Sequence, residues 1–216
     1  LSCQEVHLKP RRDGETLKRF EVQQGDIFMA DRGYAHPGGI SHVARQGGDV
    51  LVRLNLVTLP LYEPGAKQRV DILAHARTLA PGQASDWAVT VRPKDEPLIR
   101  GRLCVVRKTA QAAAKARERV RRESQRNASE LQPETLEAAD YVLVFTTLGQ
   151  PVSAEQVLEL YRLRWQIELE FKRLKSLMDL GHLKKHDEQA ARSWLQGKLL
   201  VALITSSLIA HAERVS

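Results

Sequence analysis

The sequence has few cysteines, few aromatic residues and no long apolar segment. Its two cysteines, Cys3 and Cys104, are too far apart for a zinc knuckle and too few for a disulfide scaffold. Aromatic residues make up only 5% of the chain, which argues against a platform that stacks the bases of single-stranded nucleic acid. The longest apolar run, from Leu199 to Ala210, contains hydroxyl residues and is too short to span a bilayer. We therefore expect no membrane contact, and the lack of a basic-then-apolar leader favours a cytoplasmic protein.

The chain does have an excess of positive charge and enough apolar residues for a core. Its 216 residues include 33 Lys and Arg against 26 Asp and Glu, which gives a net charge of +7. A basic chain favours polyanionic partners such as nucleic acid. With 43% apolar residues, this length predicts one domain, or one domain with a large insertion. The chain begins with Leu1 and not with Met, so we expect a part of a longer protein.

Local patterns divide the chain into three parts, residues 1–58, 59–148 and 149–216. The first part is α/β in character. Its expected elements are strands at 5–8, 18–22, 26–30 and 50–57 and a short helix at 38–46. The second part is rich in proline and predicts a mainly β insertion. Its expected elements are strands at 87–91, 103–106 and 141–147 and an exposed basic helix at 109–127. The third part predicts two helices, at 153–180 and 187–210.

The first of these two helices carries chemically active side chains. Ser153 and Gln156 have the spacing of a capping box at its start. At about 100° per residue, an apolar stripe is expected to face the core, and it consists of Leu160, Leu163, Ile167, Phe171, Leu174 and Met178. A second stripe, roughly 90° away, carries a hydroxyl, a guanidinium, a carboxylate and an ammonium group: Tyr161, Arg164, Glu168 and Lys175. The alternative interpretation is a solvated face with an i,i+4 ion pair such as Arg164–Glu168.

The spacing of this second stripe resembles a family signature. The four residues match the Tyr-Arg-Glu-Lys signature of bacterial insertion-sequence transposases of the family numbered four. The segment Ala30-Asp31-Arg32-Gly33-Tyr34, after an apolar strand, is similar to the segment around the second acidic residue of the same enzymes. Taken alone, Asp31 is better interpreted as a turn residue that accepts backbone N–H groups; together with the helix signature, the catalytic interpretation is favoured.

The resemblance implies a ribonuclease H-like α/β core with an Asp-Asp-Glu catalytic triad. Two Mg²⁺ or Mn²⁺ ions held by carboxylates can activate a nucleophilic oxygen and stabilise a leaving alkoxide. Asp31 and Glu168 are then the expected catalytic residues and metal ligands. The family's first Asp lies on a strand upstream of Val6, and neither Asp13 nor Asp26 has that position. We therefore expect the first strand and the first Asp to be missing from this chain, and the chain alone to be inactive.

The resemblance also implies contacts to DNA. It makes Tyr161, Arg164 and Lys175 ligands of phosphates near the DNA ends, a role that suits their chemistry. Neighbouring cations that extend this surface are Arg162, Lys172 and Arg173. In the basic helix, the residues expected on the DNA backbone are Arg117, Arg121 and Arg122, with Lys115, Arg119 and Arg126 beside them. Because Glu118 and Glu123 interleave, a solvated helix face is the alternative.

Together these residues predict the catalytic part of a DDE transposase. The expected reaction is metal-dependent cleavage and strand transfer at the ends of a mobile DNA element. The expected partners are double-stranded DNA, as terminal inverted repeats and target, and a second copy in a homodimeric synaptic complex at the bacterial nucleoid. Two alternatives stay open: a catalytically dead remnant or accessory protein that only binds DNA, and a nuclease on the same core that does not transpose.

Overall fold

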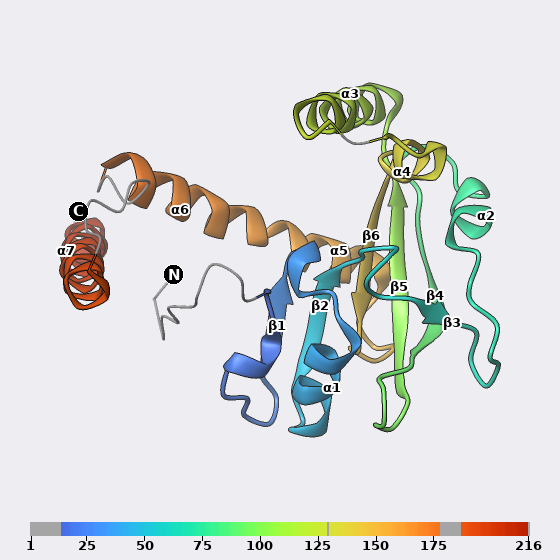
Figure 1. Cartoon of the computed structure of the whole chain (residues 1–216), viewed down its shortest axis with the longest axis horizontal. Coiled ribbons are helices and arrows are strands. Elements are labelled where there is room, and N and C mark those ends of the chain that lie inside the picture. Colours follow the sequence, from blue (N-terminus) through green and yellow to red (C-terminus); the bar gives the residue numbers. More distant parts are fainter. Residues whose placement is uncertain (1–13, 129, 178–186, 216) are drawn as a thin grey trace. The chain divides into compact units, whose positions relative to one another are not determined.

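The computed structural model describes residues 14–128, 130–177 and 187–215. The chain forms two compact units, one of residues 12–162 and the other of residues 1–11 with 163–216. The first unit contains the sheet and its covering helices, and the second contains two long helices (Figure 1).

A mixed sheet of six strands forms the first unit. In spatial order it consists of β1 (Ile27–Ala30), β2 (Asp49–Arg53), β6 (Tyr141–Thr146), β5 (Ile99–Arg107), β4 (Ala84–Val91) and β3 (Leu61–Tyr62). Only β1 and β2 are parallel, and every other neighbouring pair is antiparallel. The α/β class expected from the sequence is confirmed, and the strands of the expected insertion extend the same sheet from β2 outward.

The parallel pair is joined by helix α1 (Pro37–Arg45), as a parallel connection requires a crossover. Two glycines, Gly47 and Gly48, follow this helix and lead into β2. Gly47 has φ +81°, a conformation that glycine adopts without strain. A Cβ on Gly48 would lie 2.8 Å from Val22 and 2.9 Å from Val43, so only glycine fits between them. The turn is therefore tight enough to place β2 directly beside β1.

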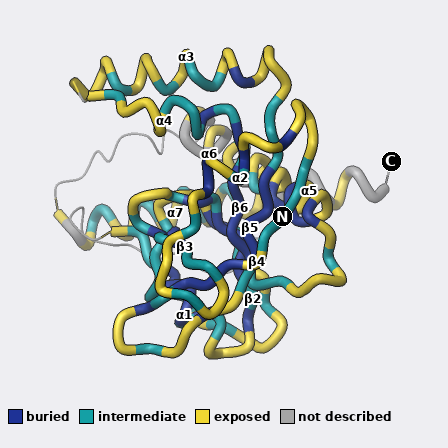
Figure 2. The backbone as a smooth tube through the Cα atoms, turned by 90° about the vertical axis from the view of Figure 1, so that its right-hand side faces the viewer, coloured by how far each residue is buried: buried dark blue, intermediate teal, exposed yellow. Residues whose placement is uncertain are grey.

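The strands of the sheet consist largely of buried residues (Figure 2), and these residues belong to two core clusters. Because successive strand residues point to opposite faces, Val50 and Val52 join one cluster and Leu51 joins the other. The larger cluster includes residues of α1 and of α2 (Ile72–Arg77). The smaller cluster contains Cys104 and packs against α5 (Ala154–Arg162). Burial raises the pKa of the Cys104 thiol to about 12, which makes this cysteine an unreactive core residue.

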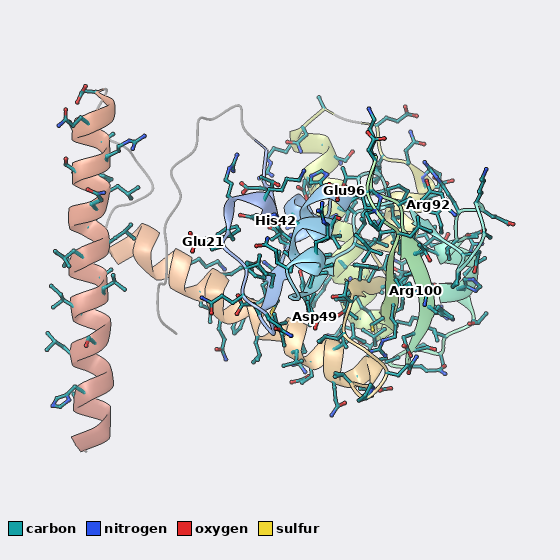
Figure 3. The ribbon with its side chains drawn as sticks, turned by 90° about the horizontal axis from the view of Figure 1, so that it is seen from below. Glu21, His42, Asp49, Arg92, Glu96 and Arg100 are labelled. Carbon is teal, nitrogen blue, oxygen red and sulfur yellow. The ribbon has the colours of Figure 1, made fainter. Side chains whose placement is uncertain are left out.

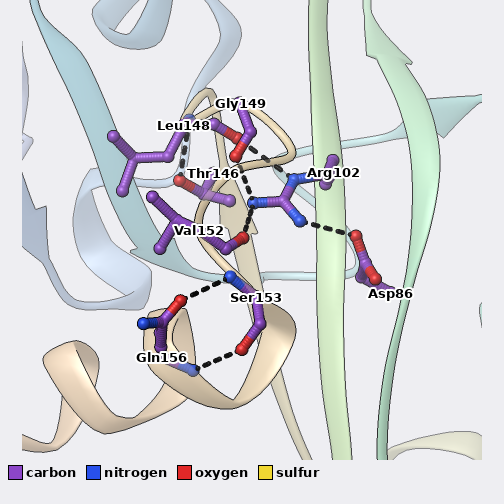
Figure 4. Close-up of polar contacts among 8 residues, drawn as sticks. All are labelled: Asp86, Arg102, Thr146, Leu148, Gly149, Val152, Ser153 and Gln156. Carbon is purple, nitrogen blue, oxygen red and sulfur yellow. Dashed lines mark hydrogen bonds and ion pairs between the residues drawn. The ribbon is translucent and has the colours of Figure 1, made fainter.

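A buried arginine fixes the loop that leads into α5 (Figure 4). Arg102 on β5 donates to the carbonyl oxygens of Leu148, Gly149 and Val152 and to Asp86 Oδ2 at 2.8 Å. The capping box at the start of α5 is confirmed, because Ser153 N–H donates to Gln156 Oε1 and Gln156 N–H donates to Ser153 Oγ. These bonds place the start of α5 on the sheet.

Several local expectations are wrong. The segment at 18–22 is not a strand, because the 3₁₀ helix η1 (Leu17–Arg19), capped by Thr16, occupies its start. The strand expected at 50–57 ends at Arg53. Helices α2 and α4 (Pro133–Ala138) and the short strand β3 were not predicted. The basic helix is confirmed as α3 (Ala110–Arg126), and the strand expected at 5–8 lies outside the described residues.

The single helix expected at 153–180 is two helices, α5 and α6 (Arg164–Leu177), with a turn at Leu163. No glycine or proline marks this turn, so the sequence pattern runs through it unchanged. The apolar stripe is wrong at the two members whose side chains are described, since Leu160 and Leu163 are 37% and 49% exposed while Val157 and Tyr161 are buried. The side chains of Ile167, Phe171, Leu174 and Met178 lie outside the described part of the chain. The last helix is α7 (Glu188–Val215), and no described helix is both long and apolar enough to cross a membrane.

Candidate active site and DNA-binding surface

Asp31 lies directly after β1, at the carboxyl end of the parallel pair. It is exposed and caps the 3₁₀ helix η2 (Arg32–Tyr34), where its Oδ1 accepts the N–H of Gly33 at 2.8 Å. The expected position of Asp31 at the end of a strand is confirmed. Its hydrogen bond with Gly33 is also the contact that the turn interpretation predicts. The hydrogen bond fixes the orientation of a carboxylate that stays open to solvent.

A second acidic residue, Glu15, lies beside Asp31, and no sequence pattern indicated it. A Cβ built on Gly33 would lie 3.1 Å from Asp31 Oδ1 and 3.2 Å from Glu15 Cγ, so both acidic side chains contact this glycine closely. The Glu15 carboxylate also accepts a hydrogen bond from the hydroxyl of Tyr34. Burial, this hydrogen bond and the charges of Glu15 and Asp31 raise the pKa of Tyr34 to about 12. The phenol therefore stays protonated at neutral pH and is a hydrogen-bond donor here.

Cations gather at the same edge of the sheet. Strands β5 and β2 run in the same direction, because both are antiparallel to β6. The edge of the sheet that carries Asp31 is therefore also the edge where β2 ends, at Arg53, and where β5 ends, just before Lys108. Lys108 Nζ donates to the carbonyl of Ala139. Burial, followed by the charges of Arg53 and Arg32, lowers the pKa of Lys108 to about 8, against an opposing effect of Asp140. These cations are thus close enough to repel one another.

The signature residue Tyr161 is buried in the smaller core cluster, with Leu51, Cys104 and Val144. Its ring packs on the sheet near the end of α5 and does not lie on an exposed helix edge. Its neighbour Arg162 is exposed and pairs with Glu159 at 2.9 Å. The helix break after Arg162 separates Tyr161 from the other three signature residues. Their DNA contacts stay predictions.

Arg164 and Glu168 form an ion pair on α6, with 2.7 Å between Nη2 and Oε1. This is the i,i+4 contact of the solvated-face interpretation, and it also holds the Glu168 carboxylate in one orientation. Lys172 is exposed on the same helix. Lys175 and Arg173 lie on α6, but their side chains are outside the described part of the chain. Asp31 and Glu168 belong to different compact units, so their pairing as metal ligands stays a prediction.

The predicted DNA contacts on helix α3 fall into two groups, one half-buried and one exposed. Arg117 is half-buried and pairs with Asp140 at 3.1 Å, a contact that attaches the helix to the start of β6. Arg121 and Arg122 are exposed, and Arg122 pairs with Glu118 at 2.9 Å. A structural role therefore accounts for Arg117 without DNA.

A hollow of about 460 Å³ lies at the other edge of the sheet, where β2 and β5 begin. Its lining includes Asp49 and Arg100, both labelled in Figure 3. Asp49 Oδ1 accepts the hydroxyl of Thr147 at 2.6 Å. Since Asp31 follows the opposite ends of the strands, this hollow is not part of the candidate active site.

Comparison with known proteins assigns the chain. A family model described as "Transposase DDE domain" matches residues 11–204. The chain belongs to the DDE transposase family. The InsL transposase of insertion sequence element IS186A from Escherichia coli K12 is 35% identical over 96% of this chain, and so is the transposase of element IS421 from Escherichia coli. The transposase of element IS231F from Bacillus thuringiensis is 27% identical over 86% of the chain.

This DDE transposase domain spans 58% of the length of the IS186A and IS421 relatives, and the match covers 42% of the IS231F relative. No solved structure matches the chain significantly. The assignment therefore comes from sequence relatives, and the geometry described above comes from this fold alone.

The donor chemistry of the DDE transposase residues suits a hard divalent cation. Asp31 and Glu168 supply carboxylate oxygens, which are the ligands that Mg²⁺ and Mn²⁺ prefer. Both carboxylates are accessible, and each is oriented by one hydrogen bond from its own element. Within the described residues, no three His, Cys, Asp or Glu side chains converge as a ligand group. Each carboxylate is thus by its chemistry a suitable donor for such a cation.

Proposed function

We propose that this domain cleaves DNA at the ends of an insertion sequence and transfers the freed strand to a target, with Asp31 and Glu168 as metal ligands. The observation that carries the proposal is the position of Asp31, an oriented and exposed carboxylate at the carboxyl end of a parallel strand in a DDE transposase domain. Ligands commonly bind at that edge of α/β sheets, because the strand ends bring their following loops together.

The finer family assignment is part of this proposal. The β1–α1–β2 unit, with the acid after β1, supports a ribonuclease H-like core. Strands β3 to β6 lie between this unit and the signature helices, which supports residues 59–148 as an insertion. The spacing of Tyr161, Arg164, Glu168 and Lys175 supports membership of the transposase family numbered four, in spite of the break at Leu163.

The residues have separate roles in the proposed reaction. Asp31 and Glu168 hold Mg²⁺ or Mn²⁺, two ions in the complete site. When bound, these ions would activate the attacking oxygen and stabilise the leaving alkoxide. Arg164 orients Glu168 through their ion pair and is placed to exchange this partner for a phosphate. Lys172, Lys175, Arg162 and Arg173 add positive charge for the DNA backbone on the same stretch of chain. The partners are duplex DNA and, in the synaptic complex at the bacterial nucleoid, a second copy of the protein.

The test uses the protein expressed from its complete reading frame and a duplex that carries the ends of its element. Asp31→Asn and Glu168→Gln are each expected to lower Mn²⁺-dependent end cleavage by roughly a hundredfold or more, because each removes a charged metal ligand. Matched controls are Asp26→Asn, which changes another turn carboxylate near β1, and Glu159→Gln, which changes another ion-paired glutamate. Both controls are expected to cleave like the wild type.

Undiminished cleavage by either active-site variant would contradict the assignment of that residue. A wild-type protein that binds duplex DNA but cuts no strand in either metal would instead identify a remnant that only binds DNA. Cleavage without preference for the element's ends would identify a nuclease that does not transpose.

A further inference from the structure

We propose that one face of α3 binds the phosphate backbone of duplex DNA beside the edge that carries Asp31. The face consists of Lys115, Arg119, Arg122 and Arg126, and is called the α3 basic stripe below. The inference rests on the proposed function, because it assumes that DNA is the substrate. It goes beyond that function by separating the cations of α3 that meet DNA from those that maintain the fold.

The burial of α3 defines its inner side. Ala113 is buried, and Ala116, Arg117, Val120 and Ser124 are half-buried. At about 100° per residue these five positions fall on one side of the helix. The four residues of the α3 basic stripe lie on the opposite side, within an arc of roughly 60°, and all four are exposed. The stripe is therefore a continuous outward surface.

Most cations of the α3 basic stripe form no ion pair in the described part of the chain. Arg122 pairs with Glu118, whereas Lys115, Arg119 and Arg126 have no acidic partner in the described part of the chain. Helix α3 carries six basic and two acidic residues, a net charge of +4 out of +7 for the whole chain. Like charges at i,i+4 destabilise a helix, and packing requires none of these side chains. A polyanionic ligand offers a reason for this arrangement.

The place of α3 in the fold links the stripe to Asp31. Helix α3 follows β5 at the carboxyl edge of the sheet and projects beyond it, as Figure 1 shows. Its connection to β5 contains Lys108, whose charge interacts with those of Arg53 and Arg32. Arg117 fixes the helix through Asp140. Cations thus lie both near Asp31 and on the outer face of the helix that follows β5.

The chemistry of the stripe favours the backbone of a duplex. Helix α3 contains no aromatic residue that could stack on an unpaired base. Lysine and arginine at helical spacing bind phosphates and give little sequence readout. From Lys115 to Arg126 the stripe is about 16 Å long, which corresponds to roughly five phosphate steps of one strand at 3.4 Å each. Such a surface would hold the DNA that flanks the cleavage position.

The test compares two triple variants of the full chain with equal loss of charge. The stripe variant carries Lys115→Gln, Arg119→Gln and Arg126→Gln. The control variant carries Lys67→Gln, Arg69→Gln and Lys94→Gln, which are also exposed but lie on other loops. Binding to a short duplex of arbitrary sequence is measured by fluorescence anisotropy in EDTA at several salt concentrations, so that the result does not depend on metal or on cleavage. Thermal unfolding is measured alongside.

The stripe variant is expected to lose at least roughly tenfold in affinity at ~0.1 M salt, and its slope of log affinity against log salt is expected to fall by about 2 to 3. The control variant should stay within about twofold of the wild type. Equal losses in both variants would show a net-charge effect and overturn the proposal. An unchanged affinity of the stripe variant would overturn it too. If the wild type binds duplex in this way but does not cleave element ends, the stripe stands and the proposed catalytic function fails.

Discussion

Arg102 on β5 and Asp86 on β4 form an ion pair of 2.8 Å in which the guanidinium is almost completely buried. The same guanidinium donates to three carbonyl oxygens of the loop between β6 and α5. One side chain therefore neutralises the charge of Asp86 and closes the turn that leads into the signature helices. The position of Tyr161 on the sheet depends on this turn, since α5 begins directly after it.

Replacing Arg102 with Met should strongly destabilise the first unit. The change leaves Asp86 and three carbonyl groups without their partner, and breaking a buried pair in this way costs about 3–5 kcal/mol. Urea unfolding measures the loss. Arg77→Met is the matched control, because its pair with Glu137 is exposed and screened by solvent, so its loss should change the stability far less. Similar losses in both variants would contradict the central role of Arg102.

The capping box of α5 should contribute measurably to stability. Ser153→Ala removes the hydroxyl that accepts the N–H of Gln156, and the expected loss is about 1 kcal/mol in the free energy of unfolding. Gln125→Ala, at an exposed position of α3, should change this free energy by less than about 0.5 kcal/mol. A cap that formed no contact in solution would give no difference between the two variants.

Gly33→Ala should impair cleavage more than stability. The new methyl group would lie 3.1 Å from Asp31 Oδ1 and 3.2 Å from Glu15 Cγ, so the Asp31 carboxylate, the proposed metal ligand, must shift by a few tenths of an ångström. We expect end cleavage to fall at least roughly tenfold, because misplacement on this scale disturbs a positioned group. Gly14→Ala is the control, since a Cβ there meets nothing within 4 Å. Normal cleavage by Gly33→Ala would show that this orientation of Asp31 is unimportant.

Lys108 should make the stability depend on pH in the alkaline range. Its pKa is lowered to about 8 in the folded protein, from 10.5 in the absence of burial. Between these two values the unfolded chain binds more protons than the folded one, so the free energy of unfolding should rise with pH, by up to about 1.4 kcal/mol per unit. Below pH 8, Lys108 is charged in both the folded and the unfolded protein, so the unfavourable free energy of burying its charge is fully present.

Urea unfolding of the wild type and of Lys108→Met between pH 7 and pH 10 checks this prediction. The methionine variant cannot titrate at this position, so its stability should lack the rise that Lys108 causes in the wild type. Parallel curves for the two proteins would show that the pKa of Lys108 is not lowered by folding.

Local sequence signals predicted those parts of the fold that local interactions decide. The apolar run of residues 141–146, the charge of α3 and the Ser153–Gln156 spacing each act within one element, and each was predicted correctly. The segment at 18–22 alternates as a strand does, yet it has no partner strand in the described sheet and η1 lies at its start. The break at Leu163 also escaped prediction, because no residue type there prevents a continuous helix.

In the candidate site, too, the sequence predicted what local pattern decides and missed what tertiary contacts decide. Asp31 was identifiable because it follows an apolar strand in a recognisable motif. Glu15, Arg53 and Lys108 were not, since they are far from Asp31 in sequence and come near it only through strand pairing and through the contacts around Gly33. The sequence likewise could not separate Arg117, which pairs with Asp140, from the outward cations of the same helix.

By itself, the sequence determined the excess of positive charge, the acidic residue after a strand, the basic helix and the spacing of the signature residues. These are properties of residue type and order, which folding does not change. The tertiary structure alone decided that Tyr161 is buried, that Glu15 and cations lie near Asp31, and that one face of α3 is outward and mostly unpaired. Burial and ion pairing depend on which distant segments meet, and that is set by the packing of the sheet and its helices.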